Sequence, residues 1–281
     1  MRWKAILSVI LSAILYSVFL FINRIFLKDK IEPFAFAWGC AVFGAIYALA
    51  YILATRSFRE IRKIPVKGWW SILFLSLFGT IFIRTLLVFG QSMTTATNTA
   101  FIQRTAPVFA LLFSIFLLKE RIQAKKILYL SMMIIGVFLL SVVDKFSASL
   151  GNILIMGTAI GIGFDQAYSR KIIKNGVSPY LLTAIIYLTG FVFQSLITLI
   201  FSKFPSQGYG IFAISGFLLI ASILFRNIGL DTLKAGVVSS LLLLVPIFTA
   251  ILGFVFLGEA FSPMQYVGAF FILGFGFLLM S

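Results

Sequence analysis

Four ionisable residues lie inside long apolar stretches of the sequence: Arg84, Arg104, Asp165 and Arg226. A charge within a membrane-spanning helix is costly and marks a functional site by default. Counting 1.5 Å of rise per residue from each segment's centre places Arg84 and Arg104 roughly 5–8 Å to the outer side of the membrane midplane. The same count places Asp165 and Arg226 roughly 7–9 Å to the inner side, where they are expected to pair.

The two outer arginines have no acid at their depth, so they favour an anion such as a carboxylate or a phosphate. The alternatives are arginines that reach an interface or join two helices, and a static pair of Asp165 with Arg226 or Arg170. Polar and aromatic residues share helical faces with the charges, as a small amphiphilic solute requires. The candidate substrate-binding residues are Arg84, Gln91, Phe101, Arg104, Tyr16, Asn23, Asp165, Tyr168, Ser222 and Arg226.

Other chemistry has little support in the composition. The chain has no histidine and one cysteine, Cys40. A disulfide framework and a metal site built on His or Cys are therefore excluded, and no cofactor is expected. No set of nucleophile and base is visible, which disfavours a membrane-embedded enzyme.

The elements that position these residues are apolar helices. Of 281 residues, 61% are hydrophobic and 11% are charged, and the mean hydropathy is +1.11. A soluble protein of this length could not hide so much apolar surface, so lipid is the expected solvent. The sequence predicts an all-α membrane protein of ten spans: Ala5–Phe26, Pro33–Ala54, Trp69–Phe89, Ala96–Leu118, Ile127–Val143, Leu150–Ser169, Tyr180–Phe201, Gly210–Leu230, Ala235–Leu257 and Met264–Met280.

The net charge of +15 suggests nucleic acid or an anionic membrane surface as a partner. Because the bases lie in short loops between apolar segments, we interpret them as orientation signals and expect no nucleic acid. Their distribution predicts a multi-pass protein of the plasma (inner) membrane with both termini in the cytoplasm. The first segment is expected to be a retained helix and not a signal peptide.

One stretch of the sequence occurs twice, over residues 89–120 and 228–259. A gapless superposition aligns Gly90 with Gly229, Pro107 with Pro246, and Glu120 with Glu259. The match extends to two halves, residues 1–143 and 150–281, of five predicted helices each. Because five is odd, the halves enter the membrane in opposite directions, as in transporters built from inverted repeats.

The repeated residues are expected to form a scaffold that moves. Pro107 and Pro246 are predicted to kink their helices. Glu120 and Glu259 are predicted to close the cytoplasmic and outer ends. The charged residues inside the apolar segments do not follow the repeat, since Arg104 aligns with Leu243. We interpret these unrepeated residues as the ones that specialise the protein for its function.

This pattern resembles the drug/metabolite transporter superfamily, EamA type, in which each half has a proline-bearing fourth helix that ends in Gly-Glu. The second half has Gly258-Glu259, while the first departs from the pattern with Lys119-Glu120. The resemblance implies a cavity lined mainly by helices one, three, four, six, eight and nine, and transport by alternating access.

We therefore expect a transporter for a small anionic or zwitterionic metabolite, such as an amino acid or a compound derived from one. A carrier of phosphorylated metabolites or nucleotide sugars is the main alternative, because it also needs arginines. A structural or channel-like membrane protein is the third alternative. The sequence predicts neither the oligomeric state nor the coupling ion.

Overall fold

The computed structural model describes residues 2–26, 32–93, 102–121, 123–140, 150–205, 207–257 and 263–280. Within these ranges the secondary structure is helical and contains no strand. The elements are α1 (Arg2–Phe26), α2 (Pro33–Thr55), α3 (Phe58–Arg62), α4 (Val66–Leu77), η1 (Phe78–Arg84), α5 (Thr85–Met93), α7 (Ala106–Leu118), α8 (Ala124–Leu140), α9 (Leu150–Lys174), α10 (Pro179–Phe201), α11 (Tyr209–Thr232), α12 (Ala235–Leu241), η2 (Leu242–Leu244), α13 (Val245–Leu257) and α14 (Pro263–Met280).

Six helical stretches among the described residues are long and apolar enough to cross a membrane. They are Arg2–Ile22, Phe34–Thr55, Val66–Leu87, Pro179–Phe201, Tyr209–Thr232 and Ala235–Phe256. Two further apolar helices, Ala106–Leu118 and Tyr266–Leu278, are shorter. The all-α class of the prediction is confirmed for the described residues, and the total of ten spans stays a prediction.

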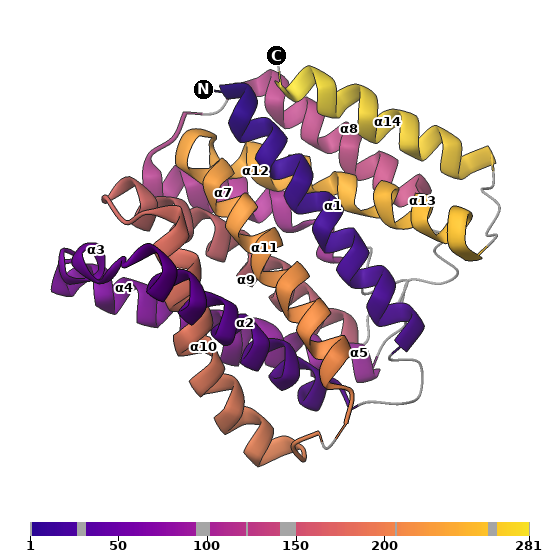
Figure 1. Cartoon of the computed structure of the whole chain (residues 1–281). Helices are drawn as coiled ribbons and strands as arrows, with labels where there is room; N and C mark the ends of the chain where they lie inside the picture. Colours follow the sequence, from indigo (N-terminus) through magenta and orange to yellow (C-terminus); the bar gives the residue numbers. More distant parts are fainter. Residues whose placement is uncertain are drawn as a thin grey trace.

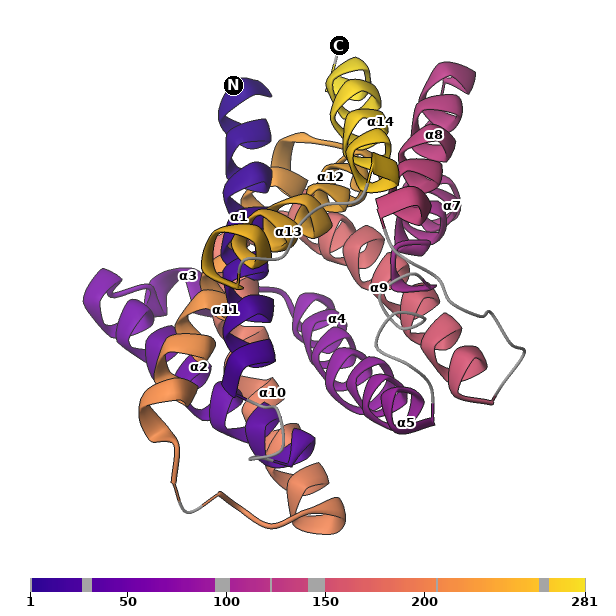
Figure 2. The ribbon, with the colours of Figure 1, turned by 90° about the vertical axis from the view of Figure 1, so that its right-hand side faces the viewer.

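The helices pack in long pairs (Figure 1). Helix α1 packs along α11, α2 along α10, α7 along α9, and α8 along α14. Both termini lie at the same end of the molecule, which we call the terminal end (Figure 1). Turned by 90°, the molecule shows α8 and α14 at the upper right, α9 below α8 on the same side, and α2 on the opposite side (Figure 2).

Small residues allow the close pairing of α1 with α11. The Ser12 hydroxyl donates to the Ser222 carbonyl at 2.8 Å, and the Ser222 hydroxyl donates back to the Ser12 carbonyl at 3.1 Å. Gly229 lies against α1 so closely that an added Cβ would stand 2.2 Å from Cγ2 of Val9. Gly90 meets α9 in the same way, with Ile155 Cδ1 at 2.6 Å from an added Cβ. Such contacts are typical of helices that associate in lipid.

The predicted third, fourth and ninth segments are not uniform α-helices. The third contains a π-helical turn, η1, that ends at Arg84. The fourth has a turn at Arg104 and Thr105 before α7, and the ninth has the 3₁₀ turn η2 before α13. Pro107 and Pro246 are the second residues of α7 and α13, where a missing N–H costs little. The prolines thus begin helical segments that follow an irregular turn.

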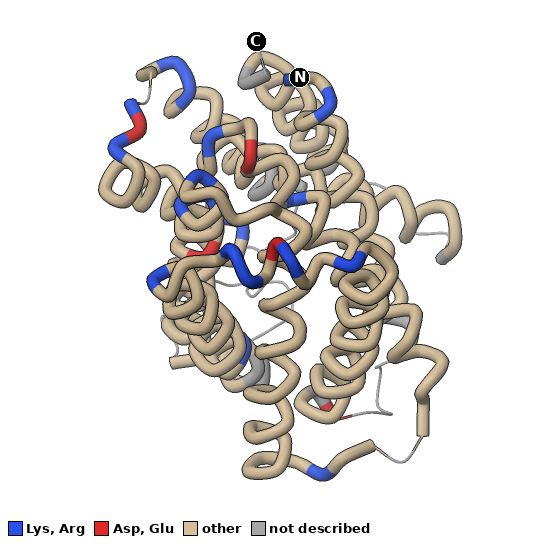
Figure 3. The backbone as a smooth tube through the Cα atoms, turned by 60° about the vertical axis from the view of Figure 1, so that its left-hand side comes forward, with Lys and Arg blue, Asp and Glu red and all other residues tan. Residues whose placement is uncertain are grey.

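Most lysines and arginines of the described chain lie on helix ends and connections, and they are spread from the terminal end to the middle of the molecule and beyond (Figure 3). The helix interiors are nearly free of charge, as the composition of the ten predicted segments requires (Figure 3). The few charges that remain within the bundle belong to the candidate site.

The end of α7 has a backbone conformation that favours glycine at the position that Lys119 occupies in this chain. Lys119 adopts a left-handed backbone conformation, with φ at 53° and ψ at 35°, and its amide donates to the Ser114 carbonyl. Glycine enters this region without penalty, whereas a side chain costs about 1 kcal/mol. The left-handed turn directs the chain so that Glu120 faces α9.

Lys119→Gly is therefore expected to raise the midpoint of thermal unfolding in detergent, because it removes the strain of the left-handed turn. The gain is expected to be about 0.5–1 kcal/mol. Lys119→Ala, which removes the same charge but keeps a Cβ, serves as the control and should give no gain. Equal midpoints for the two variants would contradict the strain.

Candidate functional site

Two adjoining cavities lie among η1, α9 and α11, and one of them, the main cavity, is also lined by α1. The main cavity has a volume of about 260 Å³ and also reaches α7, α12 and η2. The side cavity has a volume of about 200 Å³ and extends toward α2, α4 and α10. The two share a wall made of Gly79, Ile83, Arg84, Ile162, Leu219, Ile223 and Arg226. A solute in one cavity therefore lies beside the other.

The structure brings most of the predicted charged residues together. Arg84, Arg104 and Arg226 line the main cavity, with Tyr16 and Ser222 among its other walls. Asp165 lines the side cavity together with Arg84 and Arg226. Pro107 lines the main cavity as well. Residues from five different helical segments thus meet at one site.

Other predicted site residues lie elsewhere or outside the description. Tyr168 lines neither cavity, because its ring packs in an aromatic cluster, stacked on Phe164 at 5.3 Å and edge-on to Phe74. Phe101 and Glu259 lie outside the described residues, and so do the side chains of Gln91 and Asn23. Pro246 lies on α13 and is not among the residues lining the cavities.

Arg226 and Asp165 form the ion pair that their equal depth predicted. Nη1 of Arg226 donates to Oδ2 of Asp165 at 2.8 Å, and the pair joins α11 to α9. Arg226 also donates to Oδ1 of Asn227 at 3.2 Å, and Asn227 donates to the Thr183 hydroxyl at 2.9 Å. Asp165 thus neutralises one of the three cavity arginines.

Within the described part of the chain, the hydrogen-bond partners of Arg84 are weak and neutral. Its Nη1 lies 3.5 Å from the Ala37 carbonyl oxygen and 3.5 Å from Oε1 of Gln194. Both separations exceed those of a strong charge-assisted hydrogen bond. Gln194 is buried on α10 and also donates to the Thr198 hydroxyl. Gln194 keeps the guanidinium in place without neutralising it.

Arg104 stands at the turn before α7 and faces the main cavity near Tyr16. No carboxylate of the described chain lies within ion-pair distance of it. The cavity walls therefore carry three guanidinium groups and one carboxylate among the described residues. This surplus of positive charge attracts an anion into a site of low dielectric constant.

The walls also present neutral polar groups. Gln166 is buried and lines the main cavity, and its Oε1 has no hydrogen-bond partner among the described residues. Gln103 and Ser239 are further polar lining residues. The prediction missed Gln166, Gln103 and Gln194 because it searched for charges. The signal that could have identified them was a single amide side chain within an apolar helix. Within the described ranges, no three Cys, Asp or Glu side chains gather closely enough to hold a metal ion.

A second buried ion pair lies near the terminal end. Nε of Arg170 donates to Oε1 of Glu120 at 2.7 Å, with both side chains almost completely buried. The Arg170 Nη1 also contacts the carbonyl oxygens of Leu230 and Leu233, at the end of α11. Lys174 lies 3.6 Å from the same carboxylate oxygen. We call this group the Arg170 clamp, because it ties α9 to the ends of α7 and α11.

Comparison with known proteins agrees with this picture. The model of the EamA-like transporter family matches residues 3–142 and 149–281. An "Uncharacterized transporter" of Methanothermobacter thermautotrophicus is 26% identical over 235 residues, which is 77% of this chain and 66% of that protein. The "Uncharacterized transporter YetK" of Bacillus subtilis is 23% identical over 225 residues, 74% of this chain and 67% of that protein. The matched region is thus about two thirds of each relative.

One solved crystal structure has the same fold. It superposes with a TM-score of 0.82 over 98% of this chain and 96% of that chain. Its sequence identity is 18%, so the likeness concerns the fold alone.

The Arg170 clamp gives a stability prediction. Arg170→Ala leaves the Glu120 carboxylate buried with its main partner gone, which typically costs about 3–5 kcal/mol. We expect a clear fall in the midpoint of thermal unfolding in detergent. Arg59→Ala, which removes an exposed arginine from α3, is the control and should change the midpoint little.

The double variant Arg170→Ala/Glu120→Ala should recover part of the loss, since it removes the uncompensated charge as well. Equal midpoints for Arg170→Ala and the Arg59→Ala control would contradict the clamp.

Proposed function

The chain belongs to the EamA-like transporter family, and on this basis we propose that it carries a small anionic or zwitterionic metabolite across the membrane by alternating access. It is an integral membrane protein with several membrane-spanning helices. An amino acid or an amino-acid derivative is the proposed solute class. The main cavity is the proposed substrate site.

The surplus positive charge of the cavity supports this proposal most directly. Asp165 neutralises Arg226, whereas Arg84 has only an amide and a carbonyl as partners and Arg104 has no ion-pair partner among the described residues. A carboxylate that accepts hydrogen bonds from Arg104 and Arg84 would offset one of these two positive charges. Such charge-assisted hydrogen bonds are about twice as strong as neutral ones.

The other end of a zwitterion has acceptors in the same cavity. The partnerless Oε1 of Gln166 is placed to accept from an ammonium group. The ring of Tyr16 offers a π face to a cation. The apolar walls, Ile83, Leu219 and Ile223, suit a short aliphatic or aromatic body.

The size of the cavity favours a small solute over the main alternative. Pockets for drug-sized ligands measure about 300–1,000 Å³. The main cavity, at about 260 Å³, lies below this range, as an amino acid would need. A nucleotide sugar is larger than most drugs. A small phosphorylated metabolite would still fit and remains the second candidate, because the arginines suit phosphate equally well.

The inverted repeat of the two halves is part of the proposal, and the packing supports it. Exchanging the halves turns the contact of α1 with α11 into that of α9 with α5 and η1, and both contacts are present. It also turns the contact of α7 with α9 into that of α13 with α1. Pairs α2 with α10 and α8 with α14 exchange onto themselves. The Arg170 clamp would then close the terminal end in one of the two access states.

We further propose that the terminal end faces the cytoplasm, with both termini inside. The many lysines and arginines that follow the second, fourth, sixth and eighth predicted segments support this orientation. The proposal for Glu120 is closure of the same end through Arg170, without contact with the solute. Glu259 is proposed to close the opposite end. This proposal rests only on the alignment of Glu259 with Glu120 in the repeat.

Arg104→Ala is expected to abolish uptake of the solute into proteoliposomes, because it removes the unpaired guanidinium from the cavity. The protein should remain folded, since no carboxylate among the described residues forms an ion pair with Arg104 and would be left without a partner. Size-exclusion elution and thermal unfolding check the fold, and radiolabelled uptake checks the activity. Arg104→Lys, which keeps the charge but not the fork of donors, should retain partial uptake.

Normal transport by Arg104→Ala would refute the site assignment. Competition separates the two solute classes: inhibition of uptake by amino acids supports the proposal, and inhibition by phosphate esters alone supports the second candidate.

A further inference from the structure

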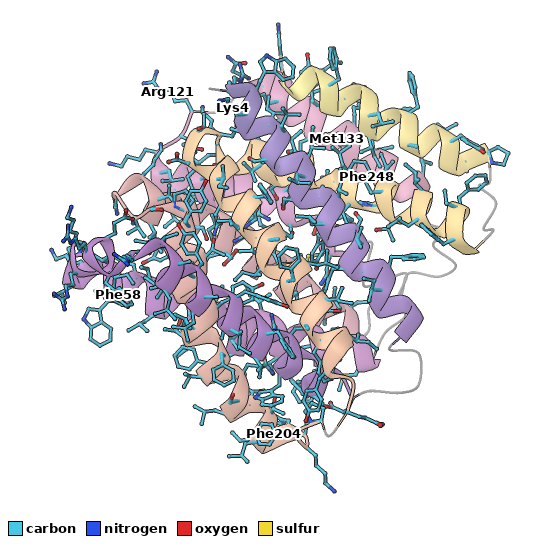
Figure 4. The ribbon with its side chains drawn as sticks, in the orientation of Figure 1. Lys4, Phe58, Arg121, Met133, Phe204 and Phe248 are labelled. Carbon is cyan, nitrogen blue, oxygen red and sulfur yellow. The ribbon has the colours of Figure 1, made fainter. Side chains whose placement is uncertain are left out.

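A third cavity lies at the terminal end, apart from the substrate site. It has a volume of about 290 Å³ and lies between α7, α12 and the start of α8. Its lining residues are Leu111, Ser114, Glu120, Arg121, Gln123, Lys126, Lys234, Gly236, Val237 and Ser240. None of them lines the main or the side cavity. We call it the terminal pocket. Figure 4 shows that Arg121, one of its lining residues, lies at the same end of the molecule as Lys4.

The charges of the terminal pocket are unbalanced. Arg121, Lys126 and Lys234 line it, and the ammonium of Lys234 donates to the backbone carbonyl of Arg121. Glu120 is the one acid among the described lining residues, and its charge already serves Arg170 and Lys174. Three basic residues therefore line the terminal pocket, and no described acidic residue of the lining is left to neutralise them.

The pKa of Lys126 is affected by the positive charges around it. Burial lowers the pKa of the Lys126 ammonium from its ordinary value, and the positive charges of Arg2 and Lys234 lower it further. An anion in the pocket would counter both effects, because it stabilises the charged form. The protein thus holds like charges together where a bound anion would relieve their repulsion.

One acceptor also lacks a donor. Oε2 of Glu120 is buried and has no hydrogen-bond partner among the described residues, while Oε1 holds Arg170. A buried carboxylate oxygen without a partner costs free energy unless a ligand supplies a donor. The pocket therefore suits a ligand that carries a phosphate and, next to it, a hydroxyl group.

The apolar surroundings point to a ligand with hydrocarbon chains. Leu111 and Val237 form part of the wall. Exposed apolar residues continue from the pocket along α7 and α8: Leu112, Ile115, Phe116, Ile127 and Leu128. In a membrane protein such a surface contacts lipid tails, and basic pockets between helices at this depth bind lipid headgroups.

We propose that the terminal pocket binds the headgroup of an anionic phospholipid of the phosphatidylglycerol type. Lys126 and Lys234 contact the phosphate, with Arg121 at the rim. A glycerol hydroxyl donates to Oε2 of Glu120, and the acyl chains run along α7 and α8. Because Glu120 belongs to the Arg170 clamp, the lipid stabilises the closed terminal end.

The test measures thermal unfolding of the full-length protein in detergent with phosphatidylglycerol, phosphatidylcholine or inorganic phosphate added. Phosphatidylglycerol should raise the midpoint, and the other two should not. In Lys126→Gln/Lys234→Gln the apparent affinity for phosphatidylglycerol should fall roughly tenfold or more. Lys126→Arg/Lys234→Arg, which keeps the charges, should retain most of it.

The matched control is Lys63→Gln/Lys125→Gln, which removes two exposed lysines that do not line the pocket. An equal loss of lipid affinity in the control would overturn the proposal, because it would show attraction to charge in general. An equal effect of phosphatidylcholine, or of inorganic phosphate, would overturn it as well. These outcomes are independent of the transported solute, since the pocket shares no residue with the substrate site.

Discussion

A guanidinium group among apolar helices needs an acceptor, and the organisation of this protein follows from where each arginine finds one. Arg170 finds a carboxylate and two backbone carbonyls, and it joins three helix ends. Arg226 finds Asp165 across the cavity wall. Arg84 has only weak neutral partners, and Arg104 pairs with no carboxylate of the described chain. The first two arginines join helices of the bundle, and the last two are the ones that we propose bind the solute.

The charges in the apolar segments were the most predictable part of the site. Depth along a helix depends only on the rise per residue, so the pairing of Asp165 with Arg226 followed from counting. The alternative partner, Arg170, lies nearer the helix end and takes Glu120. Tyr168 was assigned to the cavity from its helical face, but its ring packs against Phe74 and Phe164. The helical face of a residue predicts the direction in which its side chain points. It does not predict which neighbouring side chains pack against it.

The helix breaks were harder to predict than the helices. Pro107 and Pro246 indicated that their helices are irregular. The sequence did not indicate that each proline follows a turn and begins a new helical segment. The π-helical turn that ends at Arg84 has no proline or glycine pair to mark it. These breaks bring Arg84 and Arg104 to the main cavity. The irregular backbone lies where it lines a cavity, as membrane proteins require.

We propose that the surplus positive charge of the main cavity selects a solute that carries a carboxylate. Counterflow into proteoliposomes tests this selection with two matched solutes, an amino acid and its amide, which differ in that carboxylate alone. We expect saturable exchange of the amino acid at a rate at least about tenfold above that of the amide, since the lost charge-assisted hydrogen bonds are worth about 1.5–3 kcal/mol each. Equal rates for the two solutes would contradict it.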